Sequence, residues 1–257
     1  EQASEAAAPS SAPAAASAPA ASSSVDPSVR GEVEKAPRIR QVIAQRMRES
    51  LDLSTQLTQV HEVDVTRIVQ LRKKAKASFQ QQAGVNLTYL PFITKAVAEA
   101  LKQHPKLNAS FSEDNKEITY HASEDIAIAV DTEKGLLVPV IKDADRKGII
   151  EISKELGELS AKARAGELKS QDMQGATFTI SSLGGIGGTS FTPIVNAPEV
   201  AILGLTRSRM APVWDGQQFV ARNMLPMSLS YDHRAIDGAL AARFLQKLVT
   251  LLRDPRN

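Results

Sequence analysis

The sequence predicts a mixed α/β domain in which a β-sheet is flanked by helices. Two patterns alternate between residues 38 and 257: apolar residues spaced three or four apart, which indicate helices, and short runs rich in β-branched residues, which indicate strands. The content of 42% hydrophobic and 23% charged residues is typical of a globular protein. No internal repeat divides this region, so it is expected to form one domain.

Five segments carry helical signals. The first repeats Ile39, Val42, Ile43 and Met47 at helical spacing. The third begins at Pro91, a residue that the first turn of a helix tolerates, and the fourth ends against Gly166, a common helix terminator. The predicted helices cover residues 39–47, 66–82, 91–103, 151–165 and 238–252.

Short runs of apolar and β-branched residues predict the strands of the sheet. The predicted strands cover residues 57–65, 126–130, 136–141, 177–181, 199–203 and 225–231.

The first segment of the chain differs in composition from the rest. Of residues 1–24, 21 are Ala, Ser or Pro, and such a segment buries too little apolar surface to offset the entropy of ordering it. It also lacks the basic start and the leucine-rich core of a secretory signal. We therefore expect a flexible, disordered linker over residues 1–37 and a folded domain over residues 38–257.

Composition excludes several classes of function. The net charge of +2 and the aromatic content of 4% do not favour a nucleic-acid partner. No apolar run approaches the roughly 20 residues of a membrane span, so we expect a soluble protein. The basic run of residues 72–76 is expected to be the solvated face of a helix. Because the sequence has no cysteine, disulfides and cysteine nucleophiles are excluded.

The four histidines are candidates for chemistry. No two of them have the close spacing of a helical zinc site, so no metal is expected. His61 lies in a predicted strand and His104 precedes a proline, and both are more simply explained as structural residues. The four histidines are His61, His104, His121 and His233.

His233 differs from the others because charged residues surround it. It follows Asp232, precedes Arg234, and stands four residues before Asp237-Gly238, at the end of a predicted strand. A carboxylate beside an imidazole is a common way to adjust the pKa of the imidazole so that it acts as a general base near neutral pH. The alternative is a turn stabilised by an ion pair between Arg234 and Asp237, and local pattern alone does not decide between the two.

A second candidate is the glycine-rich stretch of residues 179–191, TISSLGGIGGTSF. Its order of glycines matches neither a dinucleotide fingerprint nor a phosphate loop, and the nucleophile elbow of many hydrolases is absent. The groups that remain as candidates are two hydroxyls, those of Ser181 and Ser182, at a strand end beside the flexible backbone of Gly184 and Gly185. Serines in such places are usually turn residues.

These residues carry a resemblance to a known family. The string of residues 233–238, HRAIDG, resembles the His-x-x-x-Asp-Gly motif of chloramphenicol acetyltransferase-like enzymes. With Asp232, and with FTISSLGGIGG at 178–188 and FTPIVNAPEVAILG at 191–204, the chain resembles the catalytic core of dihydrolipoyl acyltransferases of 2-oxo acid dehydrogenase complexes. It is most similar to the acetyltransferases of pyruvate dehydrogenase, and the likeness covers nearly all of residues 38–257.

The resemblance implies a chloramphenicol acetyltransferase-like fold and a set of roles. His233 matches the general base, Ser181 the hydroxyl that stabilises the oxyanion, and Asp237 the carboxylate that orders the loop. Substrate contacts are expected at Ser182, Gly184 and Gly185. The implied reaction moves an acetyl group directly between CoA and a dihydrolipoyl thiol, in a homotrimer whose active sites combine Ser181 of one chain with His233 of the next.

The resemblance also implies partners and a location. The family works with lipoyl domains, a decarboxylating dehydrogenase and dihydrolipoamide dehydrogenase, in the bacterial cytoplasm or the mitochondrial matrix. The chain lacks a lipoyl domain and a peripheral-subunit-binding domain, which indicates a core fragment. It ends LLRDPRN, without apolar residues that could anchor a neighbouring trimer, and this predicts a free trimer and no cage.

Several alternatives stay open at this level. The acyl group could be succinyl or branched-chain. The protein could also be a free-standing CoA acyltransferase for a small alcohol or amine, or a scaffold with a vestigial site.

Overall fold

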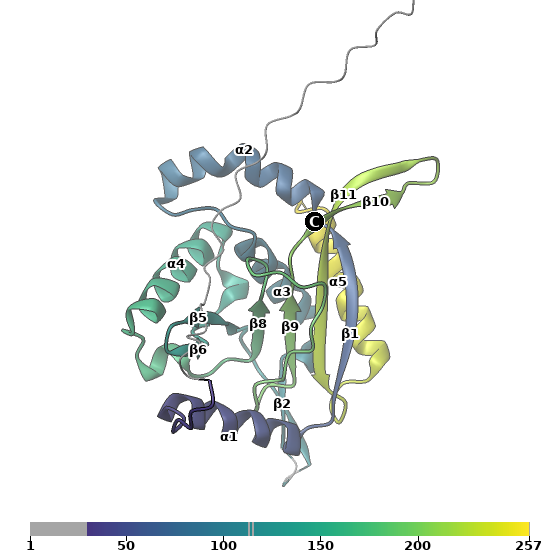
Figure 1. The fold of residues 1–257 in the computed structure, drawn as a ribbon. Coiled ribbons are helices and arrows are strands. Elements are labelled where there is room, and N and C mark those ends of the chain that lie inside the picture. Colours follow the sequence, from purple (N-terminus) through teal and green to yellow (C-terminus); the bar gives the residue numbers. More distant parts are fainter. Residues whose placement is uncertain (1–29, 113, 115, 257) are drawn as a thin grey trace, which may run out of the picture. The chain divides into compact units, whose positions relative to one another are not determined.

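A seven-stranded mixed β-sheet organises the described part of the chain (Figure 1). The structure is a computed structural model and describes residues 30–112, 114 and 116–256, so residues 1–29 of the predicted linker lie outside it. Within this range, residues 36–256 belong to one folded unit.

The main path of the sheet has the order β1-β11-β9-β8-β4-β7, and β10 extends β11 away from it. β8 pairs in parallel with β4 and with β9. β11 pairs in antiparallel fashion with β1, β9 and β10, and β4 does so with β7. The strands are β1 (Gln56–Asp64), β4 (Ile126–Ile128), β7 (Val140–Ile141), β8 (Phe178–Ser182), β9 (Ala201–Leu205), β10 (Arg209–Trp214) and β11 (Phe219–Asp232).

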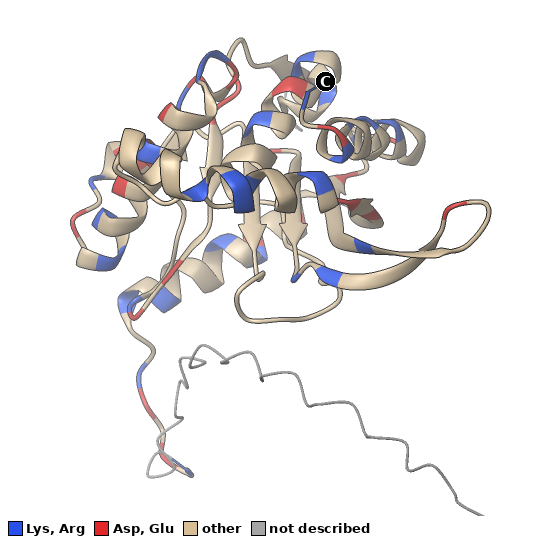
Figure 2. Cartoon of the chain, turned by 90° about the horizontal axis from the view of Figure 1, so that it is seen from above, with Lys and Arg blue, Asp and Glu red and all other residues tan. Residues whose placement is uncertain are grey.

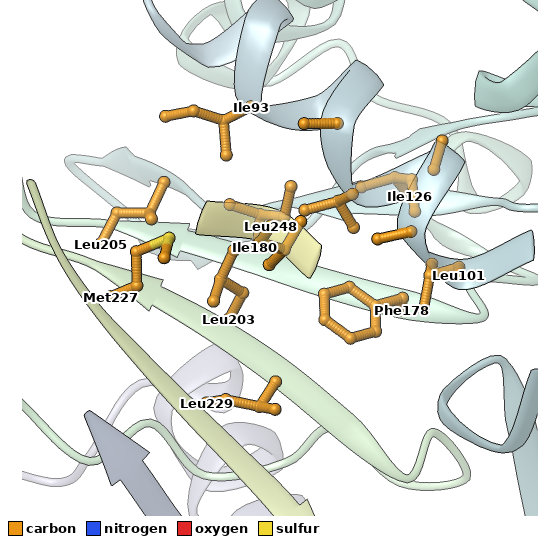
Figure 3. Close-up of a cluster of buried hydrophobic side chains, with 14 of the residues drawn as sticks. Ile93, Leu101, Ile126, Phe178, Ile180, Leu203, Leu205, Met227, Leu229 and Leu248 are labelled. Atoms are coloured by element: carbon orange, nitrogen blue, oxygen red, sulfur yellow. The ribbon is translucent and has the colours of Figure 1, made fainter. Parts of the chain in front are cut away.

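Two buried helices pack against one face of this sheet. α3 (Leu90–Gln103) is apolar along most of its length and carries Pro91 in its first turn. α5 (Gly238–Arg253) is amphipathic and buries its apolar side, including Phe244 and Leu248. Figure 3 shows their side chains meeting those of Phe178, Ile180 and other strand residues in a continuous core. This packing holds the ends of β8 and β11 in place.

Three further helices lie around this core. α1 (Arg38–Leu53) lies near the end of the sheet toward which β11 runs, and α2 (Thr66–Ala83) lies near the end toward which β8 and β9 run (Figure 1). α4 (Ile149–Ala165) packs on α3 and ends at Gly166, which has a positive φ of 74° as a helix terminator requires. α2 carries no acidic residue, and its lysines and arginines are visible in Figure 2.

The opposite face of the sheet carries several buried polar side chains. Ser228, Ser230 and Thr179 are buried there, and the Thr58 and Ser230 hydroxyls lie 2.7 Å apart. The end of the glycine-rich stretch crosses this face closely, and a Cβ on Gly204 would lie 2.7 Å from the Phe191 ring. Glycine at position 204 therefore permits the close contact of Phe191 with β9.

The structure differs from the sequence prediction mainly in the strands. The predicted strand 136–141 is two strands, β6 (Gly135–Leu137) and β7, in different sheets, and Pro139, which has no amide hydrogen to donate to a ladder, stands between them. β6 pairs with β5 (Val130–Thr132) in a separate hairpin. Two further elements were not predicted: the hairpin of β2 (Ala109–Ser112) and β3 (Glu117–Tyr120), and the edge strand β10, which contains Pro212.

All five predicted helices are confirmed, with ends within a few residues except for the first, which extends to Leu53. In the described part of the chain, short 3-10 helices at Pro105–Leu107, Ala144–Arg146 and Ser170–Met173 connect the larger elements. Within the described residues, none of the helices is long and apolar enough to cross a membrane.

Candidate active site

His233 lies in the turn that follows β11, with its side chain exposed. Its backbone N–H donates a 2.7 Å hydrogen bond to the carbonyl of Thr55, in the link between α1 and β1. The ring lies beside the buried Tyr231, with 6.2 Å between ring centroids. An exposed imidazole on an anchored backbone is accessible to a substrate or a second chain.

The charged neighbours of His233 are arranged differently from the ion pair that the sequence suggested. Arg234 pairs with Asp232 and not with Asp237: its Nε lies 3.1 Å from each Asp232 oxygen and its Nη2 lies 2.8 Å from Oδ2. Asp232 is 2% exposed, and the backbone N–H of Thr55 also donates to it. Burial favours this pairing because a carboxylate removed from water needs a cationic partner.

Asp237 has a separate role as the N-cap of α5. Its carboxylate accepts a 2.8 Å hydrogen bond from the backbone N–H of Leu240. A Cβ at the following Gly238 would lie 3.3 Å from the Gln59 amide nitrogen, which donates to the Gly238 carbonyl, so glycine leaves room for this hydrogen bond. Asp237 thus fixes where the turn ends and the helix begins.

Ser181 and Ser182 stand at the end of β8 and point to opposite faces because side chains alternate along a strand. Ser181 is half-buried on the polar face that also carries Thr179. Ser182 is exposed, and its Oγ accepts a 3.4 Å hydrogen bond from the Gly184 backbone N–H. Gly185 is exposed in the turn beyond it.

The strand register separates Ser181 from His233 within one chain. Ser181 is aligned with Gly204 on β9, and Gly204 with Ser228 on β11. His233 follows Ser228 by five residues, so it lies roughly 17 Å further along the sheet, and the two intervening strand spacings bring the separation to about 19 Å. The two residues are therefore at opposite ends of the sheet and do not meet in one chain.

A cavity of about 250 Å³ opens at the Ser182 end of the sheet. Apolar side chains of α2, α3, β9 and β11 form most of its wall, and Ser182, Thr206, Arg207 and Ser208 also line it. Its lining residues include Gly184 but not Gly185. Of the three predicted substrate contacts, two therefore line this cavity.

The other histidines lie in other parts of the fold. The His104 ring nitrogen Nδ1 lies 2.9 Å from the Ala100 carbonyl oxygen, and the His121 Nε2 lies 2.8 Å from the Ser110 hydroxyl. His61 lies within β1. Over the described ranges, no group of three or more His, Asp or Glu residues is placed to hold a metal ion.

Glu199 is a buried acid that the sequence analysis did not consider. It is 5% exposed, and its carboxylate accepts hydrogen bonds from the Thr179 hydroxyl at 2.6 Å and the Asn196 amide at 3.1 Å. Burial raises the pKa of Glu199 to about 7, and the two hydrogen bonds oppose this shift. A glutamate inside the apolar run of residues 198–205 was the sequence signal for such a group.

Replacing Glu199 with glutamine is expected to flatten the pH dependence of stability. The raised pKa means that the native state holds a proton which the unfolded chain releases above about pH 4.5, so stability falls as pH rises toward 7, by about 3 kcal/mol at most. Urea unfolding at pH 5 and pH 8 measures this difference. Glu117→Gln, at an exposed position of β3, is the control; equal pH dependence of wild type and Glu199→Gln would contradict the prediction.

The fold is similar to that of chloramphenicol acetyltransferase. A solved structure of that enzyme has a TM-score of 0.53 and covers 80% of this chain and 94% of its own. Only 16% of residues are identical, so this likeness concerns the fold. A narrower match follows from the family model for 2-oxoacid dehydrogenases acyltransferase (catalytic domain), which matches residues 30–257. The chain belongs to this family.

Close relatives are acetyltransferase components of pyruvate dehydrogenase complexes. The Pseudomonas aeruginosa protein is 50% identical over 234 residues, covering 90% of this chain and 43% of its own length. The Haemophilus influenzae protein is 48% identical over 235 residues, covering 90% of this chain and 41% of its own. The chain thus spans about two fifths of these curated relatives.

Solved structures of this type superpose well. The dihydrolipoamide acetyltransferase of Azotobacter vinelandii is 48% identical with a TM-score of 0.85, over 88% of this chain and 93% of that one. A cubic core of the pyruvate dehydrogenase multienzyme complex gives the same identity and TM-score.

The work on the Azotobacter enzyme concerns a serine, a histidine and an asparagine in its catalytic mechanism. In that protein the histidine follows the serine by 52 positions, and the asparagine follows the histidine by four. Here His233 follows Ser181 by 52 positions and Asp237 follows His233 by four. The separations agree, and an aspartate stands where the Azotobacter enzyme has an asparagine.

Proposed function

We propose that this chain is the catalytic core of a dihydrolipoyllysine-residue acetyltransferase, in which acetyl passes directly between a dihydrolipoyl thiol and CoA. The observation that carries the proposal is the spacing of Ser181, His233 and Asp237, which repeats that of the three residues studied in the Azotobacter acetyltransferase. The 48% identity to that enzyme supports the same substrates.

In this proposal His233 is the general base. An ordinary thiol with a pKa near 8.5 is only a few per cent ionised at pH 7, so a base that removes the proton during attack is useful. The imidazole takes the proton from the CoA thiol, and the sulfur bonds to the carbonyl carbon of the acetyl thioester. When the bond to the dihydrolipoyl sulfur breaks, that sulfur receives the proton from the imidazolium. The reverse direction uses the same groups.

Ser181 is proposed to donate a hydrogen bond to the oxyanion that forms when the thiol adds to the carbonyl. A donor aimed at charge that develops in the transition state lowers the barrier by about 3 kcal/mol. Asp237 keeps the His233 turn in register by capping α5. Ser182 and Gly184, which line the cavity at this end of the sheet, and the neighbouring Gly185 are proposed to contact the substrate.

The opposite positions of Ser181 and His233 support an active site shared by two chains. A closed ring of identical contacts brings the Ser181 end of one chain to the His233 end of the next, and three copies complete it in this proposal. Exposed apolar residues near His233, Leu53 and Leu57, fit a contact with a neighbouring chain.

A shared site predicts complementation between two inactive variants. If His233→Ala and Ser181→Ala chains are refolded together, about one interface in four combines an intact Ser181 with an intact His233. We therefore expect roughly a quarter of wild-type activity from the mixture. Each variant refolded alone is the control, and a mixture no more active than either would place both residues in one chain.

The assembly is proposed to contain trimers. Three chains of 27.7 kDa have a mass of about 83 kDa, whereas a cage of 24 chains has a mass of about 665 kDa. Light scattering measures the mass, and a particle with the mass of a single chain would contradict the expectation.

The experiment that tests the proposed function is an assay of acyl transfer to free dihydrolipoamide from acetyl, propionyl and succinyl donors. We expect turnover with acetyl-CoA to exceed that with the other donors. A preference for succinyl-CoA would indicate a succinyltransferase. Turnover only with a small alcohol or amine would indicate a free-standing acyltransferase, and no turnover with any acceptor would leave a scaffold role.

In the full complex, the proposed partners are lipoyl domains, the decarboxylating dehydrogenase and dihydrolipoamide dehydrogenase. The lipoyl group and CoA are substrates in this scheme, and no metal takes part. The proposed location is the cytoplasm of a bacterium, in line with the bacterial relatives.

A further inference from the structure

The buried Asp232 carboxylate holds the turn that carries His233. The Arg234 side chain binds it through Nε, at 3.1 Å from both oxygens, and Nη2, at 2.8 Å from Oδ2. Its Oδ1 also accepts the backbone N–H groups of Arg234 at 3.0 Å and Thr55 at 3.3 Å. A planar guanidinium bound through two nitrogens sets the orientation of the carboxylate as well as its distance.

The guanidinium is also fixed from a second direction. Its carbon lies 4.7 Å from the centroid of the Phe111 ring, which belongs to β2 in a different part of the chain. The Arg234 side chain is 25% exposed, so most of it is removed from water. Asp232 thus holds the guanidinium at its edge, and Phe111 holds it at its face.

The His233 imidazole has little support of its own. Within the described residues, no side chain forms a hydrogen bond with its ring, and its backbone is anchored by the 2.7 Å bond to Thr55. The direction of the ring therefore depends on the backbone of the turn, and Asp232 and Arg234 flank it on either side.

We propose that Arg234 is a positioning residue for His233. It acts through Asp232 and the turn backbone and does not touch the substrate. The inference rests on the proposed acyl transfer, since it concerns the same base. Positioning accounts for an arginine at this place, because a lysine supplies the charge but neither the planar fork nor the flat stacking surface on Phe111.

Removing the side chain tests the proposal. Misplacing a catalytic group by about 1 Å costs about 10²-fold, so Arg234→Ala is expected to lower kcat by roughly 10-fold to 100-fold. KM for CoA and for dihydrolipoamide should change by less than about twofold, because binding groups are untouched. Arg234→Lys should be nearly as slow as Arg234→Ala.

Chemical rescue sharpens the test. A cavity of about 260 Å³ already lies against Arg234, Asp232 and Phe111, and the alanine variant enlarges it. Added ethylguanidinium is expected to restore part of kcat by binding Asp232, whereas ethylammonium, which lacks the fork, should restore little. Wild-type kcat in Arg234→Lys, or equal rescue by both cations, would overturn the proposal, since charge alone would then suffice.

The C-terminal segment offers a matched control. Asp254 and Arg256 form the same Asp-x-Arg pair, with Nε to Oδ1 at 2.9 Å and Nη2 to Oδ2 at 2.7 Å, at an exposed place. Arg256→Ala should leave kcat and KM unchanged. A similar loss of kcat in both alanine variants would indicate a general effect and contradict positioning.

A second variant covers the case in which Arg234→Ala does not fold. Phe111→Leu keeps the ion pair but removes the stacking surface, and kcat is expected to fall roughly threefold to tenfold. Unchanged kcat in this folded variant would count against the proposed geometry.

The position of the ring can be followed without turnover. NMR relaxation of the His233 ring should show increased motion in Phe111→Leu and Arg234→Ala but not in Arg256→Ala. Absence of wild-type turnover would refute the proposed function, while an equally ordered His233 ring in all variants would refute the positioning role.

Discussion

His233→Ala is expected to lower kcat by about 10²-fold to 10⁴-fold, the usual contribution of a positioned general base. The loss should appear in kcat, with CoA binding nearly unchanged, because the imidazole acts on the thiol proton during attack. The ring is exposed in the single chain, so its removal should leave the fold intact. Steady-state kinetics with acetyl-CoA and dihydrolipoamide, together with calorimetric titration of CoA, provide the measurement.

His121→Ala is the control for this prediction. His121 follows β3, its Nε2 lies 2.8 Å from the Ser110 hydroxyl, and the proposed mechanism gives it no role. It should keep wild-type kcat. Wild-type turnover in a folded His233→Ala protein would contradict the proposed role of His233 as general base.

Ser181→Ala is expected to lower kcat by about 10²-fold or more, with little change in KM. The reason is that the oxyanion exists in the transition state and not in the bound substrate, so the loss of its donor does not weaken binding. Ser181 is half-buried at the end of β8, and the substitution removes one oxygen atom without disturbing the strand ladder. Kinetics with varied acetyl-CoA separates kcat from KM.

Ser182→Ala is the matched comparison, because the two serines are neighbours on one strand and face opposite ways. It should be milder, and any effect should include KM, since Ser182 lines the cavity proposed to receive substrate. If Ser182→Ala proves the slower enzyme, the hydroxyl has been assigned to the wrong serine.

Local sequence was a good guide to the helices and a partial guide to the strands. The pattern of α3, with Pro91 in its first turn and apolar residues throughout, predicts its position because helix signals lie within a few residues of one another. The sequence analysis did not predict that the strand of residues 136–141 is divided at Pro139, and it did not predict β10. Strand limits depend on which partner is present, and partners such as β1 and β11 are far apart in the sequence.

The same contrast holds for the ion pair beside His233. The sequence showed Arg234 with two carboxylates, Asp232 and Asp237, at spacings that both allow contact. The choice of Asp232 depends on its burial beneath the Thr55 backbone, and Asp237 is engaged by α5. The contact of Asp232 with Thr55 cannot be read from the spacing, because it requires an element that packs from elsewhere, whereas the Asp237 cap of α5 is local.

The sequence by itself determined the mixed α/β class, the five helices, and the turn and strand end that carry His233 and Ser181, since these depend on local patterns and motifs. The tertiary structure decided that these two residues lie at opposite ends of the sheet. The reason is the direction of the strands: β8 and β9 run parallel while β11 runs against them, so the ends of β8 and β11 point apart. Strand direction is set by long-range pairing, which no local pattern of residues contains.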